Sequence, residues 1–203
     1  MIRSAMKAGS WSRALRPWWP VGVFLVVAIL ASVVFAQFFD AKGHAADHLR
    51  SSQALFPMMA IYGVIVWATP RGHHNAVLWA CGALLLVALV IVMVGNVRVV
   101  NAIGGQAWSD EEADALGSGR PGFTSGHDLA TIGMFASVAA TILLAIVLLV
   151  GKHVHRATAI VAVVLSLVFP PWIMPGAGIL ALALGVCLAR ASAARVFDPP
   201  VRG

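Results

Sequence analysis

Three residues in the first polar stretch of the chain have types and spacing that suit a metal ion. Asp40, His44 and His48 lie four positions apart, so a helix through them places one carboxylate and two imidazoles on one face. Such ligands suit zinc, copper or non-haem iron. We take the three as candidate metal ligands, with His127 as an additional candidate, and a divalent metal ion is the one cofactor that the sequence suggests. The alternative is a water-exposed polar turn.

A second pair of residues carries charge close to apolar sequence. Arg98 stands near the end of one apolar run and Asp128 at the start of the next. A charge at this depth is costly, so it either extends to the membrane interface or pairs with an opposite charge. We expect Arg98 and Asp128 to form a structural ion pair.

The second polar stretch contains a cluster of acidic residues after Ser109. A serine followed three positions later by Glu112 is typical of a capping box at a helix start, and acids in a first turn interact favourably with the helix dipole. We therefore expect a short surface helix here rather than a calcium loop, whose alternating oxygen ligands are missing from this stretch.

Arg120-Pro121 and Ser125-Gly126-His127 stand just before another apolar run. They resemble part of the type-2 phosphatidic acid phosphatase superfamily, whose six-helix membrane members carry an outward-facing site. The pattern of that family is K-x6-R-P, then P-S-G-H, then S-R-x5-H-x3-D. The resemblance implies that Arg120, Ser125 and Gly126 hold a phosphate group and that His127 is a general acid.

The chain departs from this pattern at several positions. Ala113 occupies the place of the lysine in the first motif, and Thr124 that of the proline in the second. The third motif should lie between the last two apolar helices, but residues 168–178 contain no Arg, His or Asp. Without its histidine the family reaction has no nucleophile. We therefore assign no confident catalytic residue and favour a non-enzymatic protein.

The elements that position these residues follow from composition. The chain has 203 residues, of which 60% are hydrophobic and 11% charged, and its mean hydropathy is +0.89. Soluble domains carry about 25% charged residues. We therefore expect an all-α integral membrane protein. Its net charge of +6 is spread over short segments beside apolar runs, which favours anionic lipid headgroups over nucleic acid as the partner.

Long uncharged runs between the charged residues predict six transmembrane helices. The expected spans are residues 17–39, 51–70, 75–100, 128–151, 153–169 and 174–195, with a basic N-terminal segment at 1–16, loops at 40–50 and 101–127, and a tail at 196–203. The last two spans divide one long run at Pro170, Pro171 and Pro175, because prolines interrupt a helix. A partly re-entrant hairpin is the alternative.

The distribution of charge predicts the orientation of these spans. Most of the 14 basic residues fall on the side of the two termini, whereas most of the eight acidic residues fall in the loops 40–50 and 101–127. Basic residues are retained in the cytoplasm. Both termini are therefore expected to be cytoplasmic and both large loops external. Arginine outnumbers lysine, which is typical of GC-rich bacterial genomes, so we expect a bacterial plasma membrane.

These features together favour an accessory or assembly subunit of a larger membrane complex, with its interaction surface outside the cytoplasm. Its expected partners are membrane lipids and other membrane or extracytoplasmic proteins. A degenerate lipid-phosphate phosphatase-like enzyme or binder is one alternative, and an outward-facing metal-binding protein is another. No span centre carries a charge, which disfavours an ion-coupled transporter.

Overall fold

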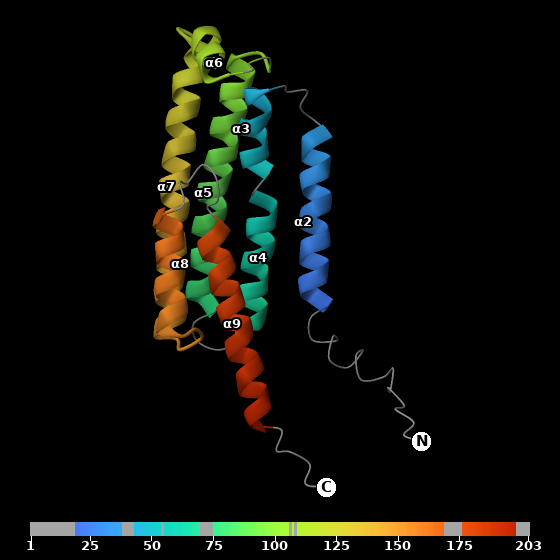
Figure 1. The fold of residues 1–203 in the computed structure, drawn as a ribbon, viewed down its shortest axis with the longest axis vertical. Helices are drawn as coiled ribbons and strands as arrows, with labels where there is room; N and C mark the ends of the chain where they lie inside the picture. Colours follow the sequence, from blue (N-terminus) through green and yellow to red (C-terminus); the bar gives the residue numbers. More distant parts are fainter. Residues whose placement is uncertain are drawn as a thin grey trace, which may run out of the picture.

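The computed structural model describes residues 19–37, 43–53, 55–69, 75–105, 107, 109–168 and 176–197. The helices in these residues form an elongated bundle (Figure 1). They are α2 (Trp19–Gln37), α3 (His44–Gln53), α4 (Leu55–Ala68), α5 (Asn75–Ala102), α6 (Asp110–Gly117), α7 (Pro121–Val150), α8 (Arg156–Val168) and α9 (Gly176–Phe197). Asp40, the N-terminal segment 1–16, residues 198–203 of the tail and the prolines at 170, 171 and 175 lie outside the described residues.

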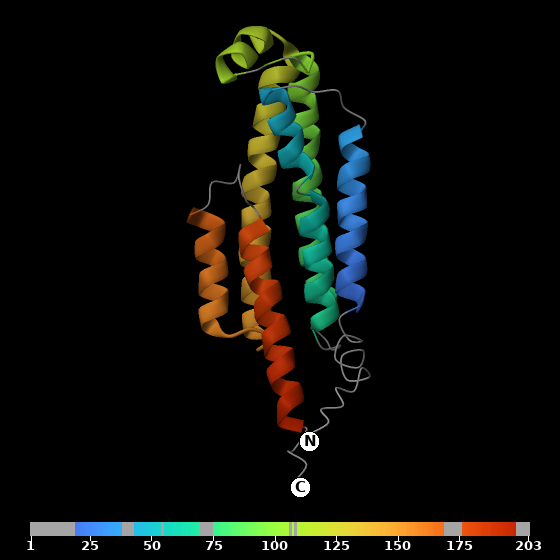
Figure 2. The same ribbon diagram turned by 45° about the vertical axis from the view of Figure 1, so that its right-hand side comes forward.

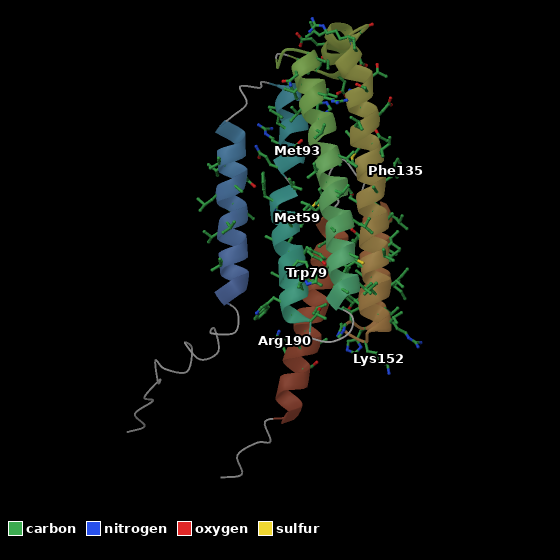
Figure 3. All side chains as sticks on the ribbon, turned by 180° about the vertical axis from the view of Figure 1, so that it is seen from behind. Met59, Trp79, Met93, Phe135, Lys152 and Arg190 are labelled. Atoms are coloured by element: carbon green, nitrogen blue, oxygen red, sulfur yellow. The ribbon has the colours of Figure 1, made fainter. Side chains whose placement is uncertain are left out.

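Several of these helices have the length and composition of membrane spans. Within the described residues, three stretches qualify: Ala45–Ala68, which joins α3 to α4, Ala76–Ala102 and Pro121–Val150. The bundle also exposes large apolar side chains, including Trp79 at 64% and Phe135 at 65% of full exposure (Figure 3). A surface of this kind suits lipid better than water. The chain is therefore a helical membrane protein, as its composition predicts.

The two longest helices, α5 and α7, lie side by side along the length of the bundle (Figure 1). Glycines bring their backbones together. A Cβ atom added to Gly126 would lie 2.8 Å from the carbonyl oxygen of Gly95, and one added to Gly133 would lie 2.7 Å from that of Ala88. Small residues permit such close packing where lipid surrounds the helices. Helices α3, α4 and α8 pack on this pair, whereas α2 packs on α4 and α9 packs on α4 and α8.

The loop predicted over residues 40–50 is wrong from His44 onward, because α3 begins there. Asp47 lies in its first turn and Arg50 in its last, both favourable with the helix dipole, and their side chains pair at 2.8 Å. Ala45 and Leu49 are buried in an apolar cluster with residues of α5 and α7. This tertiary packing explains why a polar segment is helical.

The loop predicted over residues 101–127 also contains more helix than expected. Ser109 accepts a hydrogen bond from the backbone N–H of Glu112 at 3.2 Å, which confirms the predicted start of α6. α7 begins at Pro121 rather than at residue 128, because proline at a first helical position leaves no unsatisfied N–H group. We call this end of the bundle, formed by α3, α6, the last turns of α5 and the first turns of α7, the cap.

The helices α8 and α9 form a pair at the end of the bundle opposite the cap (Figure 2). α8 has 13 residues, and at 1.5 Å per residue it covers about 20 Å, less than the roughly 30 Å of membrane hydrocarbon. Within the described residues, the predicted span 153–169 is therefore a helix that covers about two thirds of this thickness and packs on α7. Its small residues Ala159, Ala162 and Ser166 are buried, whereas most of its larger side chains are exposed.

Candidate functional site

An open pocket of about 630 Å³ lies where the end of α5 meets the start of α7 in the cap. Its lining residues are Arg98, Asn101, Ala102, Arg120, Pro121, Gly122 and Ser125. The antiparallel packing of α5 and α7 brings these two short segments together across the intervening loop and α6. We call it the two-arginine pocket.

The electrostatic character of this pocket is basic. Its lining includes Arg98 and Arg120 and no acidic residue. Nη1 of Arg120 donates a hydrogen bond to the carbonyl oxygen of Ala102, the last residue of α5, where helix carbonyls carry partial negative charge. The positive end of the α7 dipole and the negative end of the α5 dipole meet at this pocket, so its basic character comes from the two arginines. The arrangement is suited to bind an anion through charge-assisted hydrogen bonds.

The structure divides the residues of the phosphatase-like motif between different surroundings. Arg120 and Ser125 line the two-arginine pocket, although the Ser125 hydroxyl donates a hydrogen bond to the Pro121 carbonyl oxygen at 3.0 Å. Gly126 is buried against α5 and has a packing role. His127 contacts residues outside this pocket.

His127 belongs instead to a cluster of three rings. Its ring centroid lies 5.5 Å from that of His48 on α3, with the planes at 74°, and 4.7 Å from that of Phe123 one turn earlier on α7. The Nε2 atom of His48 is buried. The structure therefore brings together two of the histidines that the sequence suggested as metal ligands. We call these residues the histidine cluster.

The predicted metal site is only partly assembled by the described residues. Asp40 lies outside them, and so does the side chain of His44, although its backbone begins α3. Among the residues that are described, no group of three or more metal-binding side chains is gathered.

Arg98 and Asp128 are not brought together as the sequence analysis expected. Gly126 and Ala130 both contact Gly95 of α5, and Asp128 lies between them in the sequence. Two residues turn a helix by about 200°, so Asp128 is on the face of α7 away from α5 and its side chain is exposed. Arg50 and Asp47 form an ion pair on α3. Arg98 is thus grouped with a second arginine rather than with an acid.

Two polar contacts between helices were missed by the sequence analysis. Nδ2 of Asn96 on α5 donates a hydrogen bond to Oγ of Ser52 on α3 at 3.1 Å, and both side chains are buried. Arg190 on α9 lies over the ring of Trp67 at 4.8 Å and donates a hydrogen bond to its carbonyl oxygen. An asparagine within an apolar run was the signal for the first contact, since buried polar groups need partners.

Comparison with known proteins found no relative of this chain. No family model, curated protein or solved structure matches the chain. The assignment of function therefore depends on the cap and on the residues it brings together.

Proposed function

We propose that this protein is a non-enzymatic accessory or assembly subunit of a larger membrane complex and that its cap is the interaction surface. The observation that supports this function is the charged, ordered surface of the cap. α6 buries Ala113 and Gly117 against the bundle and leaves Asp110, Glu111 and Asp114 exposed. An acidic helix held beside a basic pocket offers a partner complementary charges of both signs, which steer association and select the partner.

The proposed orientation places the cap outside the cytoplasm of a bacterial plasma membrane, with six crossings and both termini cytoplasmic. The bias of lysine and arginine toward the termini supports this orientation. The pairing of α8 with α9 supports it as well, because a hairpin of half or full depth returns the chain to the side from which it entered.

Photo-cross-linking from the cap tests this proposal. A photoreactive amino acid at Ala115, exposed on α6, should form a discrete adduct with a partner protein in intact cells. The matched control is Ala157, which is exposed on α8 at the opposite end of the bundle and should form no such adduct. Cross-linked adducts of equal yield from both positions, or from neither, would contradict the proposal.

Cysteine labelling at the same two positions tests the orientation. A maleimide that cannot cross the membrane, added outside intact cells, should label a cysteine at position 115 but not one at position 157.

The two-arginine pocket favours a second candidate function, the binding of a lipid phosphate group. Arg98, Arg120 and the first residues of α7 line a pocket at the end of the apolar helices, where lipid headgroups lie in the proposed orientation. This candidate extends the resemblance of Arg120 and Ser125 to a phosphatase motif but needs no nucleophile.

Lipid binding in nanodiscs tests this second candidate. Arg98→Ala and Arg120→Ala should each weaken the binding of phosphatidic acid by about 10- to 100-fold, because a hydrogen bond between charged groups contributes about 1.5–3 kcal/mol. Arg156→Ala, which changes an exposed arginine at the opposite end of the bundle, is the matched control and should leave binding unchanged.

A phosphatase assay separates binding from catalysis. Release of phosphate from phosphatidic acid should stay at background for the wild type and for His127→Ala. Release that His127→Ala abolishes would instead identify an enzyme.

A further inference from the structure

The histidine cluster joins two helices that are distant in the sequence. His48 comes from α3 and His127 from α7, and their ring centroids lie 5.5 Å apart. A tetrahedral metal ion bound to two imidazole nitrogens at 2.0–2.1 Å places the ring centres roughly 5 Å apart. The spacing of the two rings in the structure is therefore close to the spacing that a shared metal ion requires.

The two rings need only a small rearrangement to share an ion. They now meet at 74°, with the edge of one ring toward the face of the other. Rotation about the Cβ–Cγ bond of one ring turns its nitrogen toward the other ring, and this torsion has a broad energy minimum in histidine.

Both histidines stand on well-packed parts of the cap. α3 is anchored by the buried residues Ala45 and Leu49 on either side of His48. α7 is anchored by Phe123, which packs edge to face with His127 at 4.7 Å, and by Gly126 against α5. Ligands held on rigid elements lose little conformational entropy on binding a metal.

A third histidine position extends the same face of α3. His44 begins α3 one turn before His48, and residues four apart share a helix face. The nearby carboxylate of Asp47 is paired with Arg50 at 2.8 Å. Imidazole ligands suit zinc, copper and nickel, whereas magnesium and calcium prefer oxygen.

We propose that His48 and His127 are two ligands of a transition-metal site that links α3 to α7 in the cap. Two imidazoles leave the remaining positions of a tetrahedral ion for water or for groups from a partner. The metal would fasten the polar start of α3 to α7.

Zinc binding by the purified full-length protein in detergent tests this proposal. The protein is stripped with chelator, dialysed against micromolar Zn²⁺ and analysed for bound metal, and about one equivalent is expected. His48→Ala and His127→Ala should each lower the affinity for Zn²⁺ tenfold or more. The matched control is His155→Ala, because His155 is exposed beyond the opposite end of α7 and should not affect binding.

A second measurement separates loss of the site from loss of the fold. With Co²⁺ in place of Zn²⁺, the wild type and His155→Ala should show the visible absorption of a tetrahedral nitrogen site, and the His48 and His127 variants should lack it while keeping wild-type circular dichroism. The proposal is overturned if the wild type binds no zinc, or if a His48→Ala/His127→Ala double variant binds as much as His155→Ala does.

Discussion

Gly126→Ala is expected to destabilise the protein by about 1–3 kcal/mol, the cost of forcing an extra methyl group into a packed interior. A Cβ atom at this position would lie 2.8 Å from the carbonyl oxygen of Gly95 and 3.0 Å from the backbone nitrogen of Val99. Both neighbours are backbone atoms of α5, which cannot turn away as a side chain can. The two helices must separate to admit the methyl group. Thermal denaturation in detergent, followed by circular dichroism, measures the effect.

The matched control for this substitution is Gly22→Ala on α2. A Cβ atom at Gly22 would have no atom within 4 Å, and alanine is the better helix former by about 1 kcal/mol. Gly22→Ala should therefore leave stability unchanged or raise it. If Gly126→Ala were as stable as Gly22→Ala, the close contact of α5 with α7 would be refuted. These two variants also test whether Gly126 is needed for helix packing rather than for holding a ligand.

Gly178→Ala is expected to open the pair formed by α8 and α9. A Cβ atom there would overlap Oγ of Ser166 and lie 2.7 Å from the carbonyl oxygen of Ala162. We expect a destabilisation of about 1–3 kcal/mol. Local opening can be detected with Ala159→Cys, a buried position on α8, in a background without Cys81 and Cys187. The cysteine should react faster with a membrane-permeant maleimide when Gly178 is alanine.

Two further variants identify the cause of this effect. Gly176→Ala is the control, because its nearest neighbour would be Cγ of Met58 at 3.4 Å, in a flexible side chain. Adding Ser166→Ala to Gly178→Ala should restore part of the protection, since it removes the hydroxyl but leaves the Ala162 carbonyl in place. Equal reactivity of the cysteine in the Gly176 and Gly178 variants would contradict the packing of α8 on α9.

The helical membrane fold could be predicted from the sequence because charged residues mark where apolar runs end. The run predicted over 75–100 corresponds closely to α5, Asn75–Ala102. The polar segments were harder to predict. α3 is helical because Ala45 and Leu49 pack on α5, and hydropathy along one segment carries no information about such contacts.

The candidate sites were predictable in their residues but not in their grouping. The spacing of His44 and His48 placed both on one helix face, and the proximity of His48 to α7 then depended on how α3 packs. Arg98 was expected beside Asp128 because both lie near one membrane interface. The rotation of α7 about its own axis, set by Gly126 and Ala130 against α5, turns Asp128 away from α5, and Arg98 lines a pocket with Arg120 instead.

The close backbone contact of α5 with α7 also has a consequence for the order of assembly. These helices are neighbours in the membrane and are separated in the sequence only by the short segment that contains α6. Contacts that close short loops form early during synthesis. The hydrogen bond from Arg190 to Trp67 joins residues 123 positions apart, so α9 can reach α4 only after nearly the whole chain has left the ribosome. We expect the α5–α7 hairpin to be the nucleus and the docking of α9 to be the last step of folding.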